Sequence, residues 1–299
     1  MKSITVYHYD AFSHIPNKGN PAGIVLNGDQ LSEDEMQNIA YKVGFNETTF
    51  PLESDVADLK LRYFTPGHEM NLCGHGTLAT IYCLKSKGLL KDKNQLMIET
   101  KAGILPIKIM WEAKDRLNIM MKQATPQFKP YTGSIKELAS AIGIEPDDID
   151  RSLPIMYGST GTWTLLVPIK SLATFSKMIP CNSSFPSILA EQPTSSIHPF
   201  TLETYHSDCT MHGRHFSSPY SGTIEDPVTG TASGVMGAYY AKYINRNFTR
   251  ELNLMIEQGQ EISKAGFVKV KVKVYHEYDD YEVEIAGTAV YVNEFVISK

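Results

Sequence analysis

The feature that most constrains this chain of 299 residues is a pattern that it contains twice. The first copy joins residues 62–66 (Arg-Tyr-Phe-Thr-Pro) to residues 73–77 (Cys-Gly-His-Gly-Thr). The second joins residues 214–219 (Arg-His-Phe-Ser-Ser-Pro) to residues 226–231 (Asp-Pro-Val-Thr-Gly-Thr). In both copies an aromatic strand end is followed by a loop that contains proline and by a helix start rich in small residues. Repetition of a unit of this kind predicts a duplicated domain with one glycine-containing helix N-terminus in each half.

The composition is compatible with two globular domains. The chain is long enough for each half to bury a core of its own, and 42% hydrophobic with 20% charged residues is typical of globular proteins. The net charge of -5 argues against a nucleic-acid surface, which needs clustered basic residues. We therefore expect no nucleic acid among the partners of this protein.

The N-terminal segment and the cysteines bear on where the protein resides. The first seven residues turn polar at once and alternate as in a strand, unlike a signal peptide or a membrane span. The four cysteines, at positions 73, 83, 181 and 209, lack the spacing of a disulfide framework or of a metal motif. Because such cysteines fit reduced thiols, we expect a cytoplasmic location and no membrane association.

Residue patterns along the chain predict many strands and few helices. Capping boxes of Ser32 with Glu35 and of Ser134 with Glu137 begin two helices, the first over residues 32–43. Helical spacing predicts further helices at residues 74–87 and 230–243. β-Branched and aromatic residues predict strands at residues 48–52, 59–64, 163–167, 268–274, 281–285 and 289–292. A linker composition at residues 123–130 places the domain boundary near residue 125, and the mixture predicts an α+β fold.

The two helix starts, at Gly74 and Gly230, are candidate anion-binding sites. The first backbone N–H groups of a helix have no partner within the helix, and glycine lets a ligand approach the backbone closely. Neither start has the Gly-Lys-Ser/Thr ending of a phosphate loop or the Gly-x-Gly-x-x-Gly spacing of a dinucleotide site. A small carboxylate or an enolate is therefore the expected ligand. In a single loop such glycines more often serve only close packing of helix and sheet, but two related loops favour binding.

Three titratable residues are candidates for acid–base chemistry. His75 is expected in the first turn of its helix, where the positive end of the dipole favours a neutral imidazole. Asp226 precedes the second helix start, and Glu47 stands among uncharged residues, where partial burial would let one carboxyl group both give and take a proton. Each residue also has an ordinary interpretation: a structural histidine, a capping or turn aspartate and a solvated glutamate.

Four possible metal ligands, His206, Cys209, His212 and His215, are spaced at regular threes. We do not favour a zinc site, because the segment is expected to be strand and turn, where this spacing does not bring side chains to one point. No pattern of supporting residues favours a metal either. The sequence therefore predicts neither a metal nor a cofactor.

Several motifs in the same order resemble those of a known family. They lie at residues 10–12, 19–23, 46–50, 62–66, 73–77, 225–230 and 287–290. In them, and over nearly its whole length, the chain resembles the phenazine-biosynthesis isomerase-like (PhzF-like) family of the diaminopimelate-epimerase fold. The resemblance implies two pseudo-symmetric α+β domains, each a curled, mostly antiparallel sheet around a central helix. The implied domains are residues 1–124 and 125–287, with a strand at about 288–299 returning to the first domain and the active site in the cleft between them.

The resemblance also implies site residues. Glu47 matches the glutamate that, in the family's phenazine enzyme, moves a proton between two carbons of trans-2,3-dihydro-3-hydroxyanthranilate. His75 and Asp226 are implied as further catalytic residues. The implied substrate-binding residues are Asn20, Gly74, Gly76, Gly230 and Thr231. Thr231 stands where the phenazine enzyme has serine, and Asn46 stands where serine is frequent, which leaves the substrate open. A homodimer is implied by analogy alone.

Together these observations favour a cofactor-independent isomerase that moves a proton within a small carboxylate-bearing substrate, with Glu47 as the acid–base group. The alternative is a catalytically silent module that binds small molecules or interacts with proteins. A two-thiol racemase or epimerase is less expected, because Cys73 could supply one thiol but we expect Asp226 as its symmetry mate. A hydrolase or metal enzyme is less expected still.

Overall fold

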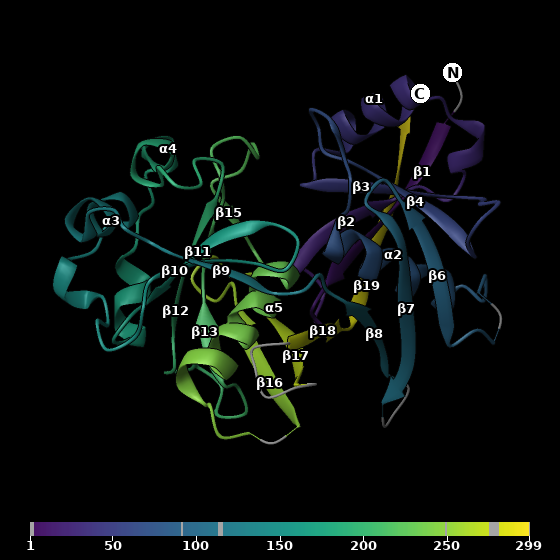
Figure 1. Ribbon diagram of the computed structural model, residues 1–299. Helices are drawn as coiled ribbons and strands as arrows, with labels where there is room; N and C mark the ends of the chain where they lie inside the picture. Colours follow the sequence, from purple (N-terminus) through teal and green to yellow (C-terminus); the bar gives the residue numbers. More distant parts are fainter. Residues whose placement is uncertain (1–2, 91, 113–115, 249, 275–280, 299) are drawn as a thin grey trace. The chain divides into compact units, whose positions relative to one another are not determined.

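The computed structural model describes residues 3–90, 92–112, 116–248, 250–274 and 281–298. The chain divides into two compact units (Figure 1). Unit 1 comprises Met1–Lys122 and Ala286–Lys299, and unit 2 comprises Gln123–Ile285. The expected domain ends, 124 and 287, differ from these bounds by two residues each. Residues 1, 2 and 299, which the expected ranges include, lie outside the described residues.

Unit 1 is built on one sheet. Its strands follow the order β19–β1–β2–β3–β4–β6–β7–β8, and the short strand β5 pairs with β4. The pairs β2/β3 and β4/β6 are parallel and the others are antiparallel. The bounds are β1 (Ser3–Ala11), β2 (Asn20–Ile24), β3 (Glu47–Leu52), β4 (Leu59–Phe64), β5 (Glu69–Met70), β6 (Gln95–Thr100), β7 (Gly103–Glu112), β8 (Arg116–Lys122) and β19 (Ala289–Ser298). Because β19 pairs with β1, the chain ends in the unit where it began.

The central helix of unit 1 is α2 (Gly74–Ser86). It contacts β1, β2, β3, β8 and β19, and residues around its whole circumference are buried, as in a helix enclosed by its sheet. A second helix, α1 (Glu33–Val43), begins at the expected capping box of Ser32 and Glu35 and ends at Gly44, whose φ of 70° suits glycine. It buries only the face that carries Met36 and Ile39. A single 3₁₀ turn, η1 (Gly28–Gln30), precedes it.

Unit 2 also surrounds one buried helix with strands. The first four strands are neighbours in the order β9–β10–β11–β12. Strand β12 also pairs with β13 and with β14. Beyond these, β13 pairs with β16, β16 pairs with β17, and β14 pairs with β15. The pairs β11/β12 and β13/β16 are parallel. The bounds are β9 (Gln127–Pro130), β10 (Met156–Ser159), β11 (Trp163–Pro168), β12 (Ser196–Thr201), β13 (Met211–Gly213), β14 (His215–Phe216), β15 (Glu225–Asp226), β16 (Glu251–Gln258), β17 (Gly266–Val274) and β18 (Tyr281–Gly287).

The buried helix of unit 2 is α5 (Gly230–Tyr239), which packs against β10 and β17. A Cβ at Gly237 would lie 2.5 Å from Cγ1 of Val270, so glycine is needed for helix and sheet to approach this closely. The helix expected over residues 230–243 is α-helical only as far as Tyr239. The next segment, Tyr240–Ile244 (η5), is a π-helical turn.

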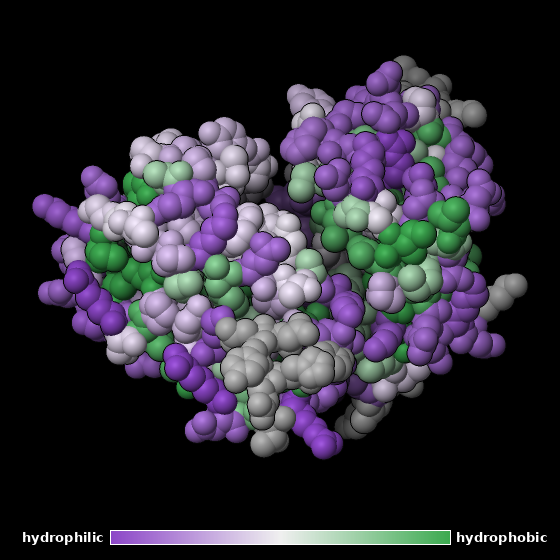
Figure 2. Space-filling view, viewed as in Figure 1, coloured by the Kyte–Doolittle hydropathy of each residue, from purple (hydrophilic) through white to green (hydrophobic). Residues whose placement is uncertain are grey.

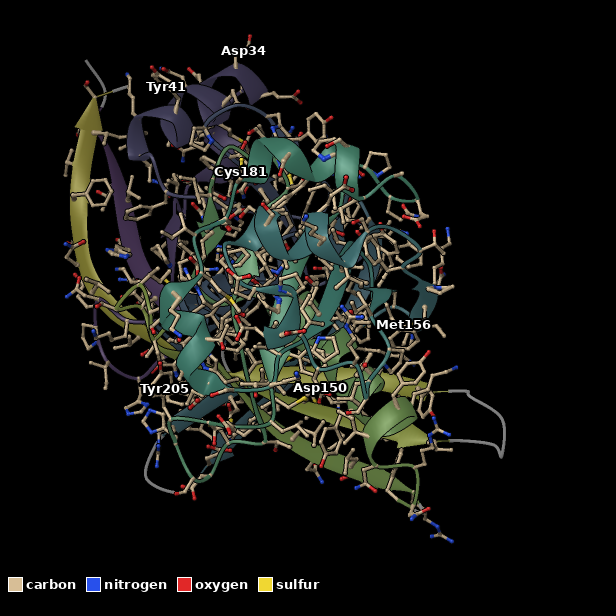
Figure 3. The ribbon with its side chains drawn as sticks, turned by 90° about the vertical axis from the view of Figure 1, so that its left-hand side faces the viewer. Asp34, Tyr41, Asp150, Met156, Cys181 and Tyr205 are labelled. Carbon is tan, nitrogen blue, oxygen red and sulfur yellow. The ribbon has the colours of Figure 1, made fainter. Side chains whose placement is uncertain are left out.

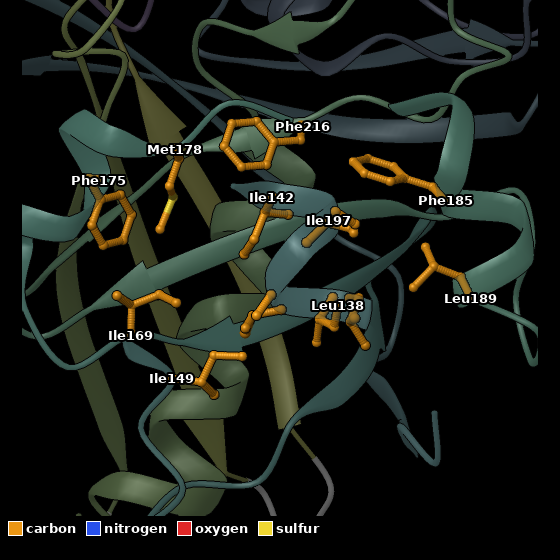
Figure 4. Packing of buried hydrophobic residues seen from close by; sticks show 14 of the residues in the cluster. Leu138, Ile142, Ile149, Ile169, Phe175, Met178, Phe185, Leu189, Ile197 and Phe216 are labelled. Atoms are coloured by element: carbon orange, nitrogen blue, oxygen red, sulfur yellow. The ribbon is translucent and has the colours of Figure 1, made fainter. Parts of the chain in front are cut away.

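A second apolar core in unit 2 lies under its shorter helices. It joins α3 (Ile135–Ile142) and α4 (Phe185–Ile188) to the 3₁₀ turn η3 (Leu172–Lys177), and Figure 4 shows Ile142, Phe175, Phe185 and Phe216 among its side chains. Two further 3₁₀ turns are η2 (Pro146–Asp148) and η4 (Asn182–Ser184). Ser134 accepts a hydrogen bond from the Glu137 N–H, which is half of the capping box expected there.

On the face drawn in Figure 2, hydrophilic residues cover much of both units. Hydrophobic residues form smaller patches on the surface of each unit. Within the described part of the chain, no helix combines the length and the apolar character needed to cross a membrane.

Candidate active site

Glu47, Cys73 and His75 come together at the start of α2. Glu47 is the first residue of β3, Cys73 is the N-cap residue of α2, and His75 lies in its first turn. Oε2 of Glu47 lies 3.1 Å from Nε2 of His75, and Sγ of Cys73 lies 3.5 Å from Nδ1 and 3.8 Å from Nε2 of the same ring. The side chains of His75 and Glu47 are 9% and 16% exposed. The three groups therefore form one mostly buried cluster within hydrogen-bonding reach.

The fold of unit 1 explains why these residues meet. Strands β2 and β3 are parallel neighbours, with Ala22 opposite Glu47, so both strands begin at the same edge of the sheet. Helix α2 contacts both strands. Asn20, the first residue of β2, is fully buried, and its Nδ2 lies 3.3 Å from Nδ1 of His75. The predicted residues Asn20, Glu47 and His75 are thus brought together, and Cys73 joins them.

The two glycines of this helix start differ in their surroundings. A Cβ at Gly76 would lie 2.7 Å from Oγ1 of Thr49 and 3.0 Å from Sγ of Cys73, whereas a Cβ at Gly74 would meet no atom within 4 Å. The N–H of Gly76 also donates to Sγ of Cys73 at 3.2 Å. Gly76 is therefore required by packing, while the space beside Gly74 is open to a ligand.

Burial and neighbouring charge act differently on the two titratable groups of α2. Burial raises the pKa of the Cys73 thiol, and the nearby carboxylate of Glu47 adds to this shift. Burial by itself lowers the pKa of His75, but Cys73 and Glu47 outweigh it and raise that pKa well above 6.5. The direction of this shift is opposite to the one that the helix dipole alone would give. A full carboxylate charge at 3.1 Å acts more strongly on the ring than the half charge of a helix end.

In unit 2, Asp226 and the start of α5 form a hydrogen-bonded group. Thr229, the N-cap residue of α5, donates from Oγ1 to Oδ2 of Asp226. Gln258 supports both: its Nε2 donates to the backbone oxygen of Asp226 at 2.7 Å, and its Oε1 accepts from the Thr229 N–H at 3.1 Å. Thr231 is partly exposed, and its backbone oxygen accepts from Oγ1 of Thr160 at 3.0 Å. Gly230 begins the helix and is buried.

The residue that corresponds to Cys73 in unit 2 is Thr229. Each is the N-cap residue of its central helix, and each lies four positions after the glutamate that begins the short strand β5 or β15. Asp226 therefore corresponds to Met70, and the expectation that it is the symmetry mate of Cys73 is wrong. The expected alignment of the two loops was shifted by three residues, from Thr229 to Asp226. Thr229 and Gln258 were missed, although the N-cap position of Thr229 was a signal that could have found it.

The regularly spaced ligands in unit 2 do not form one cluster. Nδ1 of His212 lies 3.3 Å from Glu257 and its Nε2 lies 3.1 Å from Glu261. Nδ1 of His215 lies 3.1 Å from Nδ1 of His198. The ring of His206 packs against Phe267. Each of these three histidines thus has its own partners.

Within the described residues, one group offers at least three metal-binding side chains at close range. It is Glu47, Cys73 and His75, whose donor atoms all lie within 4.8 Å of one another.

The fold has counterparts among solved structures. Unit 1 and unit 2 each enclose a buried helix in strands, and the fold is the one seen in solved epimerases and racemases. A hydroxyproline epimerase from Agrobacterium vitis aligns with a TM-score of 0.64 over 99% of this chain and 91% of its own. Its sequence identity of 9% means that this likeness concerns the fold alone.

Sequence comparison then gives the family. The model of the PhzC-PhzF family, described as phenazine biosynthesis-like protein, matches residues 9–295, and the chain belongs to this family. A crystal structure of a PhzF-family phenazine biosynthesis protein from Bacillus anthracis is 60% identical to it, with a TM-score of 0.98 and complete coverage of both chains. The resemblance and the fold class expected from the sequence are thus confirmed.

The relatives by sequence are named as isomerases. An uncharacterized isomerase of Bacillus subtilis (strain 168), YfhB, is 55% identical over 291 residues, which cover 97% of each chain. A trans-2,3-dihydro-3-hydroxyanthranilate isomerase of Pseudomonas chlororaphis is 28% identical over 267 residues, which cover 88% of this chain and 89% of its own. The chain is accordingly an enzyme of the isomerase class.

Proposed function

We propose that the chain is a cofactor-independent isomerase that moves a proton between two carbon atoms of a small carboxylate-bearing substrate, with Glu47 as the acid–base group. The observation that carries this proposal is the 3.1 Å contact between Oε2 of Glu47 and Nε2 of His75 in a mostly buried cluster. A general base needs a fixed position and limited hydration. Glu47 has both, because β3 and α2 hold it and its side chain is 16% exposed.

The proposed step needs no external oxidant or reductant. The carboxylate of Glu47 takes a proton from one substrate carbon, and the electron pair of the broken C–H bond moves into the conjugated system that ends at the substrate carboxylate. The resulting carboxyl group of Glu47 then returns the proton to a second carbon on the same face. One base is sufficient for such a transfer, and no group is oxidised.

His75 and the start of α2 are proposed to stabilise the charge that develops during this step. The raised pKa of His75, caused by Cys73 and Glu47 against the opposing effect of burial, favours a positive ring beside the reacting groups. The first turn of α2 adds the positive end of a helix dipole. Both favour an enolate-like intermediate over the free substrate.

The remaining site residues stay predictions that rest on the family. We propose that Asp226 is a further catalytic residue, and that the substrate is bound by Asn20, Gly74, Gly76, Gly230 and Thr231. The open space beside Gly74 supports its part in this proposal. The relatives named trans-2,3-dihydro-3-hydroxyanthranilate isomerase support anthranilate-like carboxylates as the first compounds to test. A cytoplasmic location and a homodimer remain expectations.

The test is the variant Glu47→Gln, which keeps the shape of the side chain but cannot take a proton. Uptake of solvent deuterium into anthranilate-like carboxylates, followed by NMR, should fall by roughly 10²–10⁴-fold, while substrate binding is largely retained. Glu53→Gln is the matched control, because Glu53 is an exposed glutamate just after the end of β3. Near-normal exchange in Glu47→Gln would sink the proposal.

Two rival functions give different results in the same experiment. A silent binding module would bind the carboxylates without deuterium uptake in the unaltered protein. A two-thiol racemase would invert a stereocentre, but the N-cap residue of α5 that corresponds to Cys73 is Thr229, which carries no thiol. One-base transfer therefore remains the function that the geometry supports best.

A further inference from the structure

The proton-transfer cluster offers three different metal-binding atoms: a sulfur, an imidazole nitrogen and a carboxylate oxygen. Around a tetrahedral zinc ion, bond lengths of about 2.3 Å to sulfur and about 2.0 Å to nitrogen or oxygen separate the S and N ligands by about 3.5 Å and the N and O ligands by about 3.3 Å. The distances here are 3.8 Å from Sγ of Cys73 to Nε2 of His75 and 3.1 Å from that nitrogen to Oε2 of Glu47. Shifts of a few tenths of an ångström would suffice for these two pairs.

The surroundings of the cluster also suit a metal. Cys73 and His75 are buried and Glu47 is nearly so, so an ion there would face little competition from water. A histidine that binds a metal through one nitrogen commonly holds its other nitrogen against a hydrogen-bonding partner. The amide of Asn20 lies 3.3 Å from Nδ1 of His75, and an asparagine amide can turn either its nitrogen or its oxygen toward a partner. Nε2 is then the nitrogen that points toward Glu47.

A second buried histidine in the same chain shows that burial beside carboxylates is not enough. Glu257 approaches Nδ1 of His212 and Glu261 approaches Nε2, so its two carboxylates lie at opposite edges of the ring. Those donors cannot meet at one ion without rearrangement. The cluster at α2 holds a sulfur within 3.8 Å of the ring nitrogen that faces the carboxylate, and this donor selects soft ions such as zinc over magnesium and calcium.

We propose that Glu47, Cys73 and His75 form an inhibitory site for a thiophilic divalent cation, for which Zn²⁺ is the best match. On binding, Cys73 loses its thiol proton to solvent as the metal–sulfur bond forms, His75 binds through Nε2 and Glu47 through an oxygen. Water completes the tetrahedron. Glu47 is then no longer available to accept a proton from a substrate carbon. The inhibitory part rests on the proposed function, but the binding part does not.

Cobalt titration of the full chain, after treatment with a chelator, tests the binding part. Co²⁺ bound to a thiolate absorbs in the near ultraviolet, and we expect this band to saturate at one Co²⁺ per chain and to disappear when Zn²⁺ is added. The titration is done on a Cys181→Ser background, because Cys181, which is labelled in Figure 3, is exposed and would bind cobalt at random. Cys73→Ser should abolish the band, and the matched control Cys83→Ser, a buried cysteine further along α2, should keep it.

The results of these experiments distinguish metal binding from inhibition of the proton transfer. A missing band in the Cys181→Ser protein, or a band that persists in folded Cys73→Ser, overturns the site and leaves a hydrogen-bonded triad only. His75→Asn provides a second variant, in which the affinity for Co²⁺ should fall at least tenfold, and an unchanged affinity overturns the site as well. If Zn²⁺ saturates the site and deuterium uptake falls at least tenfold, inhibition is supported; unchanged uptake overturns it. Failure of the proposed function would appear separately, as normal exchange in Glu47→Gln.

Discussion

The hairpins before the two central helices use the same ion pair. In unit 1, Nε and Nη2 of Arg62 donate to the two oxygens of Glu69, each at 2.7 Å. In unit 2, Nε and Nη2 of Arg214 donate to the two oxygens of Glu225 at 2.9 and 2.6 Å. Each guanidinium also lies over the phenylalanine two residues later, at 5.1 and 4.8 Å from the ring centroid. The duplication has thus preserved the frame that leads into each helix.

The residues beside this frame differ between the units. Opposite positions in the hairpins hold Tyr63 and Met70 in unit 1 but His215 and Asp226 in unit 2. At the helix starts, unit 1 has Cys73 and His75, whereas unit 2 has threonine at both matching positions. Unit 1 therefore concentrates its titratable groups on the helix, and unit 2 places them on the hairpin. The comparison indicates that after duplication the frame stayed constant while the chemical groups diverged.

The largest expected effect comes from breaking the ion pair in each unit. Arg214 is 6% exposed and also donates to the backbone oxygens of Phe175 and Met178, so Arg214→Met would leave Glu225 buried without its partner. Loss of one partner of a buried pair costs about 3–5 kcal/mol. Arg62→Met should cost only about 1 kcal/mol, since the Arg62 side chain is 16% exposed against 7% for Arg214 and Lys101 still contacts Glu69.

Tryptophan fluorescence during urea denaturation can measure the two losses separately. Trp111 lies in unit 1 and Trp163 in unit 2, and the chain contains no other tryptophan. Replacement of one tryptophan by phenylalanine makes the other a reporter of its own unit. Equal losses in the two arginine variants would contradict the expectation that the more deeply buried arginine, Arg214, contributes more to stability.

A smaller effect is expected at a position where the helices differ. Gly76 in α2 corresponds to Ala232 in α5, and its missing Cβ leaves room for Thr49 and Cys73. Gly76→Ala should destabilise unit 1 by about 1–3 kcal/mol through overpacking and displace Cys73. Gly74→Ala is the matched control and should leave stability within about 1 kcal/mol, because its Cβ would meet no atom.

Thermal unfolding and deuterium uptake together read out these glycine variants. We expect Gly74→Ala to weaken substrate binding without lowering the melting temperature, since Gly74 is a proposed binding residue. A Gly76→Ala protein as stable as the unaltered chain would show that α2 tolerates the side chain that α5 carries at this position.

Local patterns predicted the parts of the fold that depend on neighbouring residues. Ser32 with Glu35 gave the start of α1, and the small residues after Cys73 gave α2, because caps and helical periodicity act over a few residues. Features that depend on packing were harder to predict from the sequence. The role of Gln258, which bonds to Asp226 and Thr229, depends on contacts between distant segments.

The candidate site shows the same division. The motifs predicted that Glu47 and His75 matter, but their 3.1 Å contact depends on the pairing of β2 with β3. The helix dipole alone favours a neutral His75, but Cys73 and Glu47 together raise the pKa of His75. Cys73 is the N-cap residue of the same helix, whereas Glu47 comes from a strand almost thirty residues earlier in the chain.

The smallest expected effect concerns pH and the buried histidine of unit 2. His212 lies between Glu257 and Glu261, with Tyr205 (labelled in Figure 3) and Phe175 against its ring. Burial lowers the pKa of His212, but the two glutamates outweigh it, so the pKa is raised above the 6.5 of an exposed histidine. Burial raises the pKa values of both glutamates, but His212 and backbone N–H groups hold them below 4.5.

These shifts set the direction of the pH dependence. A raised histidine pKa contributes stability that is complete below pH 6.5 and is lost as the pH rises through the pKa of the folded state. The lowered glutamate pKa values contribute stability that is lost as the pH falls below 4.5. In Trp111→Phe protein, whose fluorescence reports unit 2, the free energy of unfolding should therefore decline from pH 6 to pH 9. Glu261→Gln should flatten that decline, and an equally steep decline in this variant would assign the pH dependence to other groups than the His212 cluster.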